Sequence, residues 1–93
     1  MNDTSPARVQ IGDSVIYQKL QDEVVLLNME SQHYFGLDGV GAAMWEALLR
    51  HGDVESAAAS LHPLYQVDQA TLRSDLQALV GSLVTAGLLK SAT

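Results

Sequence analysis

The apolar residues of this chain change their spacing once, near Leu37, and that change limits what the chain can fold into. Before Leu37 they come in short clusters rich in β-branched and aromatic residues, at 15–17, 24–27 and 34–37, which is typical of strands. The segments between the clusters suit turns and are too short to hold a helix. We therefore predict an antiparallel meander of three strands. Its middle strand pairs on both edges and is largely covered, and its third strand, residues 33–37, is an edge.

After residue 38 the apolar spacing is that of a helix. Apolar residues recur at i, i+3, i+4, i+7 and i+8 from Val40, just after Asp38, which we expect to be the N-cap. This helix ends at Gly52. Asp53 is the expected cap of a second, Ala-rich helix, which we expect Pro63 to kink or to end.

The third predicted helix is the longest and runs from the cap residue Asp68 to a stop at Gly87. Three strands followed by three helices make an α+β arrangement, and the same inventory is found in a winged helix-turn-helix. We expect a flexible N-terminus at residues 1–8 and a single domain at 9–90. Whether residues 8–12 add a further strand stays open.

The charge balance argues against a nucleic-acid or membrane partner. The chain has five Lys and Arg against eleven Asp and Glu, a formal net charge of −6, so it has few cations to neutralise phosphates. A DNA-reading third helix would carry several basic residues, but the third helix here holds Arg73 alone. The absence of cysteine, of a signal peptide and of a long apolar run leads us to expect a cytoplasmic protein.

No constellation of residues suggests catalysis. The three histidines, His33, His51 and His62, form no i, i+4 pair and have no carboxylate at ligand spacing, so we predict no metal site. The G-x-S-x-G nucleophile motif does not occur. Glycines 39 and 41 resemble a dinucleotide-binding turn, but the third glycine and the later acidic residue are missing. We predict a protein that is not an enzyme and needs no cofactor.

Two features suggest a binding surface. The predicted edge strand carries no Lys or Pro to block pairing, and Gly36 lets another backbone approach, although one of the protein's own helices covering this edge is an equal alternative. In the third helix, one face carries a leucine stripe, and Val80 and Val84 lie off this stripe and widen it, so this helix either lines a groove or packs in a plain core. The stripe is Leu72, Leu76, Leu79, Leu83 and Ala86. The groove candidates on this helix are Arg73, Leu76, Gln77, Val80 and Val84.

A set of short motifs resembles the PqqD-like family of leader-peptide recognition domains, closest to the stand-alone members of lasso-peptide biosynthesis. The order and spacing of these residues carry the resemblance from Val15 to Leu89, because each motif alone is short. They are Leu26-Leu27-Asn28, His33-Tyr34-Phe35-Gly36-Leu37-Asp38, Gly41-Ala42, Trp45, Leu48, Gly52, Leu61, Tyr65, Asp75, Leu79, Leu83 and Gly87-Leu88-Leu89. The chain departs from the family at Asp38, where Asn is usual, and in its turn at residues 31–32.

The resemblance implies a domain that binds the leader of a ribosomally made precursor peptide as an added strand. The implied strand edge is His33, Tyr34, Phe35, Gly36 and Leu37, facing the groove candidates of the third helix. The lasso-peptide members imply a separate cysteine protease as a partner and an ATP-dependent cyclase downstream. Two other readings stay open: a winged-helix domain of the transcription type, and a structural domain that dimerises through its edge strand.

Overall fold

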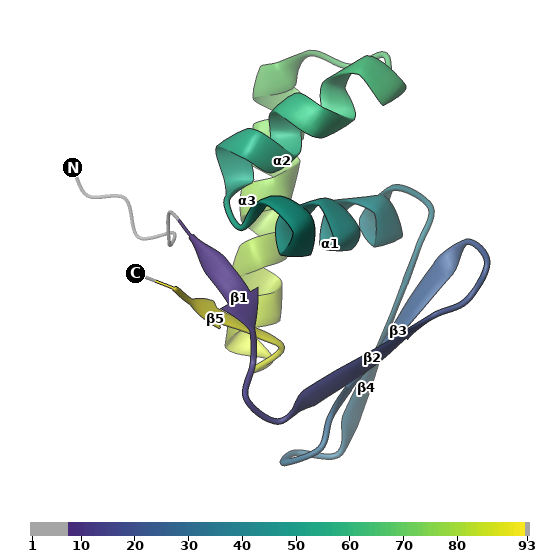
Figure 1. Cartoon of the computed structure of the whole chain (residues 1–93), viewed down its shortest axis with the longest axis vertical. Helices are drawn as coiled ribbons and strands as arrows, with labels where there is room; N and C mark the ends of the chain where they lie inside the picture. The colour runs from purple at the N-terminus through teal and green to yellow at the C-terminus, as the bar shows by residue number, and fades with distance from the viewer. Residues whose placement is uncertain (1–7, 93) are drawn as a thin grey trace.

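The computed structural model describes residues 8–92, and Figure 1 shows a meander of three strands, three helices and a second, smaller pair of strands. The elements are β1 Val9–Ile11, β2 Val15–Lys19, β3 Glu23–Asn28, β4 His33–Asp38, α1 Val40–His51, α2 Val54–Leu61, the 3-10 helix η1 His62–Leu64, α3 Gln69–Thr85 and β5 Leu89–Ser91. The predicted α+β class and the order of three strands before three helices are confirmed. The predicted flexible segment at residues 1–8 lies outside the described residues, apart from Arg8.

The meander is antiparallel in the order β2-β3-β4, so β4 is an edge strand as predicted. The two faces of the meander differ in burial. On the face toward the helices, β3 contributes Val24, Leu26 and Asn28, which are buried. On the other face, Val25 and Leu27 are half-buried, because only neighbouring side chains of the sheet flank them. The middle strand is therefore paired on both edges, as expected, but fully covered on one face only.

The helices pack against the inner face of the meander. Trp45 of α1 is fully buried, and its ring meets Tyr17 of β2 edge to face with the ring centroids 5.5 Å apart. On α3, Leu72, Leu76 and Leu83 are buried along the predicted stripe. Within residues 8–92, no helix is long and apolar enough to cross a membrane.

The second sheet answers the question left open about residues 8–12. β1 pairs antiparallel with β5, with Val9 opposite Ser91 and Ile11 opposite Leu89. The backbone N–H of Val9 also donates to the carbonyl of Gly52 over 2.9 Å. In Figure 1 this strand pair and the meander lie on opposite sides of α3. The helix α3 therefore has one flank toward each sheet.

The expected N-cap of α1 is wrong. Asp38 is the last residue of β4, where it pairs with Glu23, and its side chain caps nothing. The N-cap residue is Gly39, whose φ of 55° lies in the left-handed region that favours glycine. The N–H of Gly39 donates to the carbonyl of Asp22 over 3.2 Å, so the strand ladder continues up to the start of the helix. Because the helix starts there, Val40 is 43% exposed instead of buried in the predicted stripe.

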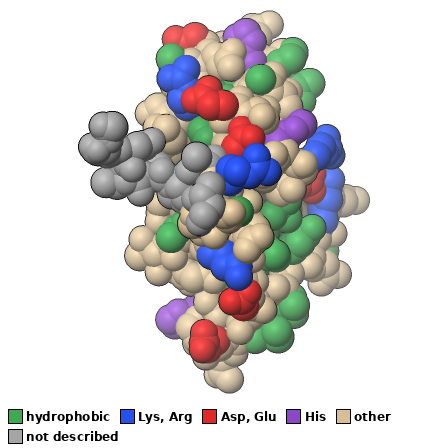
Figure 2. Space-filling model, turned by 60° about the vertical axis from the view of Figure 1, so that its left-hand side comes forward, with side chains coloured by type: hydrophobic (Ala, Val, Ile, Leu, Met, Phe, Trp, Pro, Cys, Tyr) green, Lys and Arg blue, Asp and Glu red, His purple; other side chains and the backbone are tan. Residues whose placement is uncertain are grey.

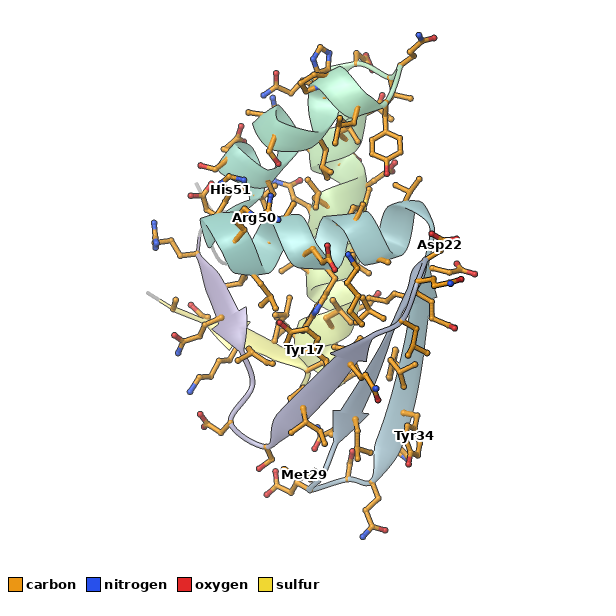
Figure 3. The ribbon with its side chains drawn as sticks, turned by 45° about the vertical axis from the view of Figure 1, so that its right-hand side comes forward. Tyr17, Asp22, Met29, Tyr34, Arg50 and His51 are labelled. Atoms are coloured by element: carbon orange, nitrogen blue, oxygen red, sulfur yellow. The ribbon has the colours of Figure 1, made fainter. Side chains whose placement is uncertain are left out.

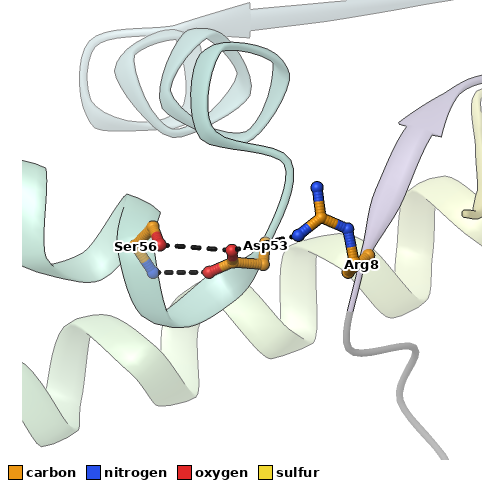
Figure 4. A network of polar contacts seen from close by, with 3 residues as sticks. All are labelled: Arg8, Asp53 and Ser56. Carbon is orange, nitrogen blue, oxygen red and sulfur yellow. Dashed lines mark hydrogen bonds and ion pairs between the residues drawn. The ribbon is translucent and has the colours of Figure 1, made fainter. Parts of the chain in front are cut away.

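The predicted cap at Asp53 is confirmed, and Figure 4 shows its contacts. The Asp53 carboxylate accepts hydrogen bonds from the Ser56 N–H at 2.6 Å and from the Ser56 hydroxyl at 3.1 Å. Arg8 lies 3.9 Å away as an ion-pair partner. The backbone hydrogen bond from Ser56 is the main cause that lowers the pKa of Asp53, and the Ser56 hydroxyl and the nearby Arg8 act in the same direction, against an opposing effect of burial.

Candidate functional site

The free edge of β4 carries unpaired backbone groups at alternate residues. The N–H of Gly39 points toward the Asp22 carbonyl, and antiparallel ladders alternate, so the backbone groups of Phe35 and Leu37 also point toward β3. The N–H and C=O groups of Tyr34 and Gly36 therefore face away from the sheet. Among the described residues, no strand pairs with this edge, and four of the six residues of β4 are exposed. The alternative in which a helix of the chain itself covers the edge is thus disfavoured.

The inner face of β4 offers apolar side chains beside that free edge. Phe35 lies opposite Leu26, and Leu37 lies opposite Val24, so both point toward the helices. Both are only half-buried, and they pack against the main hydrophobic core. A strand added to this edge would therefore place alternate side chains over Phe35 and Leu37.

The five groove residues expected on α3 do not gather beside β4. Leu76 and Val80 are fully buried, so they belong to the core of this structure instead of an open surface. Arg73 pairs with Glu55 of α2, with 2.9 Å between Nε and Oε2. Val84 is exposed at a hollow that the β1–β2 turn and β5 also line. Gln77 is half-buried on the same flank of the helix.

The opposite flank of α3 carries Leu79 and Ala86. With about 100° between successive helical residues, Leu79 lies about 160° around the helix from Gln77. The hollow beside Val84 is lined by the β1–β2 turn, β5, and Asn28 and Glu30 of the β3–β4 hairpin, so Leu79 lies on the flank of α3 away from this hollow. Leu79 and Ala86 are half-buried and pack on the core, like Phe35 and Leu37. Sequence reasoning assigned both to the core stripe and missed that they lie at its margin.

Asn28 connects this flank of α3 to the hairpin between β3 and β4. Its side-chain amide donates to the carbonyls of Ala86 and Gly87, over 3.2 Å and 3.4 Å. Its side-chain oxygen accepts from the backbone N–H groups of Glu30 and Ser31, over 3.0 Å and 3.2 Å. One buried side chain therefore holds the end of α3 at a fixed place relative to the meander. The sequence signal for this role was an amide at the end of an otherwise apolar strand.

Comparisons with known proteins identify the family of the chain. The family model described as coenzyme PQQ synthesis protein D (PqqD) matches residues 23–89, which is most of the chain. A search of curated protein sequences finds no match. Among solved structures, the chain is similar to "TbiB1 in Complex with the TbiA(beta) Leader Peptide", with 33% identity, a TM-score of 0.84, and coverage of 90% of this chain and 98% of that one.

A second similar structure is "Lasso peptide synthetase B1 complexed with the leader peptide". It has 25% identity and a TM-score of 0.81, over 90% of this chain and 99% of that one. Both of these proteins were solved with a leader peptide bound. The family model and the first structural relative each cover enough of the chain to decide the family, and they confirm the resemblance in the sequence. The chain belongs to the PqqD family.

Proposed function

We propose that this chain is a non-catalytic protein that binds the leader of a ribosomally made precursor peptide in lasso-peptide biosynthesis. The observation that carries the proposal is the open edge of β4 beside a half-buried apolar surface. The leader adds to β4 as a further antiparallel or parallel strand, the β-augmentation mode of peptide recognition. The two similar structures, each holding a leader peptide, support this proposal.

Affinity and selectivity come from different parts of the site. The backbone groups of Tyr34 and Gly36 bond to the leader backbone whatever its sequence. We expect alternate leader side chains to contact Phe35 and Leu37 of β4 and Leu79 of α3, which are half-buried at the margin of the core, and this contact selects apolar residues of suitable size. Ordering a flexible leader costs about 2–5 kcal/mol, and the hydrogen bonds and the apolar burial must offset that cost. We propose the flank of α3 with Leu79 as the helix side of the site, in place of the flank with Arg73 and Val84 that helical spacing alone suggests.

The binding serves delivery. A leader held on β4 brings the junction between leader and core to a separate cysteine protease at raised local concentration, because the second binding event becomes effectively intramolecular. An ATP-dependent cyclase then acts on the released core peptide. We place these steps in the cytoplasm, where the precursor is synthesised.

Titration calorimetry with the precursor encoded beside this chain tests the proposal. The full precursor and the isolated leader should bind with similar affinity, and the core peptide without its leader should not bind. Equal affinity for the core peptide alone would refute leader recognition. A gel shift with duplex DNA at low salt tests the transcription-type reading, for which we expect no complex.

A further inference from the structure

The outer face of the meander is unusually apolar at one end. Ile16, Leu27 and Tyr34 lie in register across β2, β3 and β4. Ile16 is 51% exposed and Tyr34 is 70% exposed, and Met29 in the adjoining hairpin turn is 50% exposed. Antiparallel sheets that pack one face on a core commonly carry polar residues on the other. Figure 3 shows Tyr34 on the far side of the sheet from Tyr17, and Met29 at the hairpin end.

The other end of the same sheet is acidic. Glu23 lies directly opposite Asp38, and Asp22 precedes it in the turn between β2 and β3, at the end far from Met29 in Figure 3. Like charges that face each other across strands destabilise a sheet, so this pair has an unfavourable effect on folding. None of these three carboxylates forms an ion pair within residues 8–92.

Four of the five basic side chains of the chain are engaged elsewhere. Figure 2 shows basic and acidic side chains in adjacent pairs on one face of the molecule. The ion pairs are Arg8–Asp53, Lys19–Glu46, Arg73–Glu55 and Lys90–Asp13. The acidic end of the sheet is thus left with unneutralised charge, which an external cation can neutralise.

We infer that the outer face of the meander docks a partner protein whose own surface is apolar with Lys or Arg at one end. This inference rests on the proposed function, because the partner is the protease that receives the leader-bound precursor. A second copy of the chain fits less well, since each copy carries a net charge of −6 and would bring more acid to this face.

The face is also continuous with the proposed leader strand. The side chain of Tyr34 points to the outer face, and Gly36 leaves its backbone bare there, so a strand added beside them places every second leader side chain on the same surface. A partner seated on Ile16, Leu27 and Tyr34 therefore also contacts the bound leader. Such a partner binds the loaded domain more tightly than the empty one.

The test uses two exposed residues outside the leader edge, in the variant Ile16→Ser/Met29→Ser. The matched control is Leu64→Ser in η1, because Leu64 is 72% exposed and lies in another part of the fold. The probe is the purified protease encoded beside this chain, titrated against the domain loaded with precursor, and leader binding is measured separately by calorimetry. We expect the double variant to lose at least tenfold in protease affinity while its leader affinity and Tm stay within error, and the control to match wild type.

Unchanged protease affinity in the double variant would overturn the inference, as would a wild-type dimer that the double variant dissociates. If the wild-type domain binds the protease but no leader, and the double variant loses the protease, the docking surface is kept and the proposed function is refuted. A second variant, Glu23→Gln, tests the acidic end of the sheet. It should weaken the salt dependence of protease binding, because one interface charge is lost, and raise the Tm, because the repulsion between Glu23 and Asp38 is removed. An unchanged salt dependence would contradict the acidic part of the inference.

Discussion

Replacing Gly36 by proline should weaken leader binding and leave the fold intact. Gly36 lies in the edge strand β4, and its N–H faces away from β3, so proline removes no hydrogen bond of the meander. Its φ is outside the positive range, and the preceding Phe35 is in a strand, which suits a residue before proline. The proline ring then occupies the space of the Gly36 N–H, so the leader carbonyl that would accept a hydrogen bond from this N–H is left without a donor.

The expected loss follows from that unpaired carbonyl. A buried acceptor left without a partner costs about 1–3 kcal/mol, which corresponds to a loss of about 5- to 150-fold in affinity. Calorimetric titration of the leader measures it, and thermal unfolding checks the fold. The matched control is Gly36→Ala, which keeps the N–H; a Cβ added at Gly36 meets no other atom within 4 Å. Leader affinity that is equal in the proline variant and the wild type would refute strand addition at β4.

Three further predictions address the helix flank, the hairpin and the helix cap. Leu79→Ala should weaken leader binding by about 1 kcal/mol through lost apolar contact, whereas Val84→Ala on the other flank should leave it unchanged. Calorimetry that shows the reverse would place the leader on the flank with Arg73 and Val84. Asn28→Ala should lower the free energy of unfolding, measured in urea, by about 2–3 kcal/mol, because the Asn28 amide donates to two carbonyls and its oxygen accepts from two N–H groups. A loss below about 0.5 kcal/mol would contradict the bridging role of Asn28. Asp53→Ala should cost about 1 kcal/mol at neutral pH. Since the folded pKa of Asp53 is lowered, its contribution is present above the unfolded pKa and is lost as the pH falls through the folded value, so the difference from wild type should shrink in acid and not in base.

The sequence predicts the main helices and strands well, because each is long enough to show the periodic spacing of its apolar residues. The meander, the cap at Asp53 and the stop at Gly87 follow from residue types at defined spacings, and the structure confirms them. The prediction of Asp38 as the N-cap of α1 is wrong because Asp38 pairs with Glu23 in the sheet. The spacing of residues in a single sequence does not reveal this strand register.

The helix face of the site was harder to predict for a related reason. Spacing along α3 separates a buried sector from two flanks, but it does not say which flank faces which sheet. β1 and β5 are three residues each, too short to show a period, and β5 and the β1–β2 turn line the hollow beside Val84. Val80 is a predicted groove residue, yet it is fully buried and belongs to the core.

Amide hydrogen exchange of β4, with and without leader, tests the central claim most directly. In the free protein, the N–H of Phe35 is already bonded to β3, whereas the N–H groups of Tyr34 and Gly36 face solvent. Strand addition predicts that the leader slows exchange at Tyr34 and Gly36 strongly and changes Phe35 much less. Saturating leader that leaves exchange at Tyr34 and Gly36 unchanged would contradict the account, wherever else on the domain the leader binds.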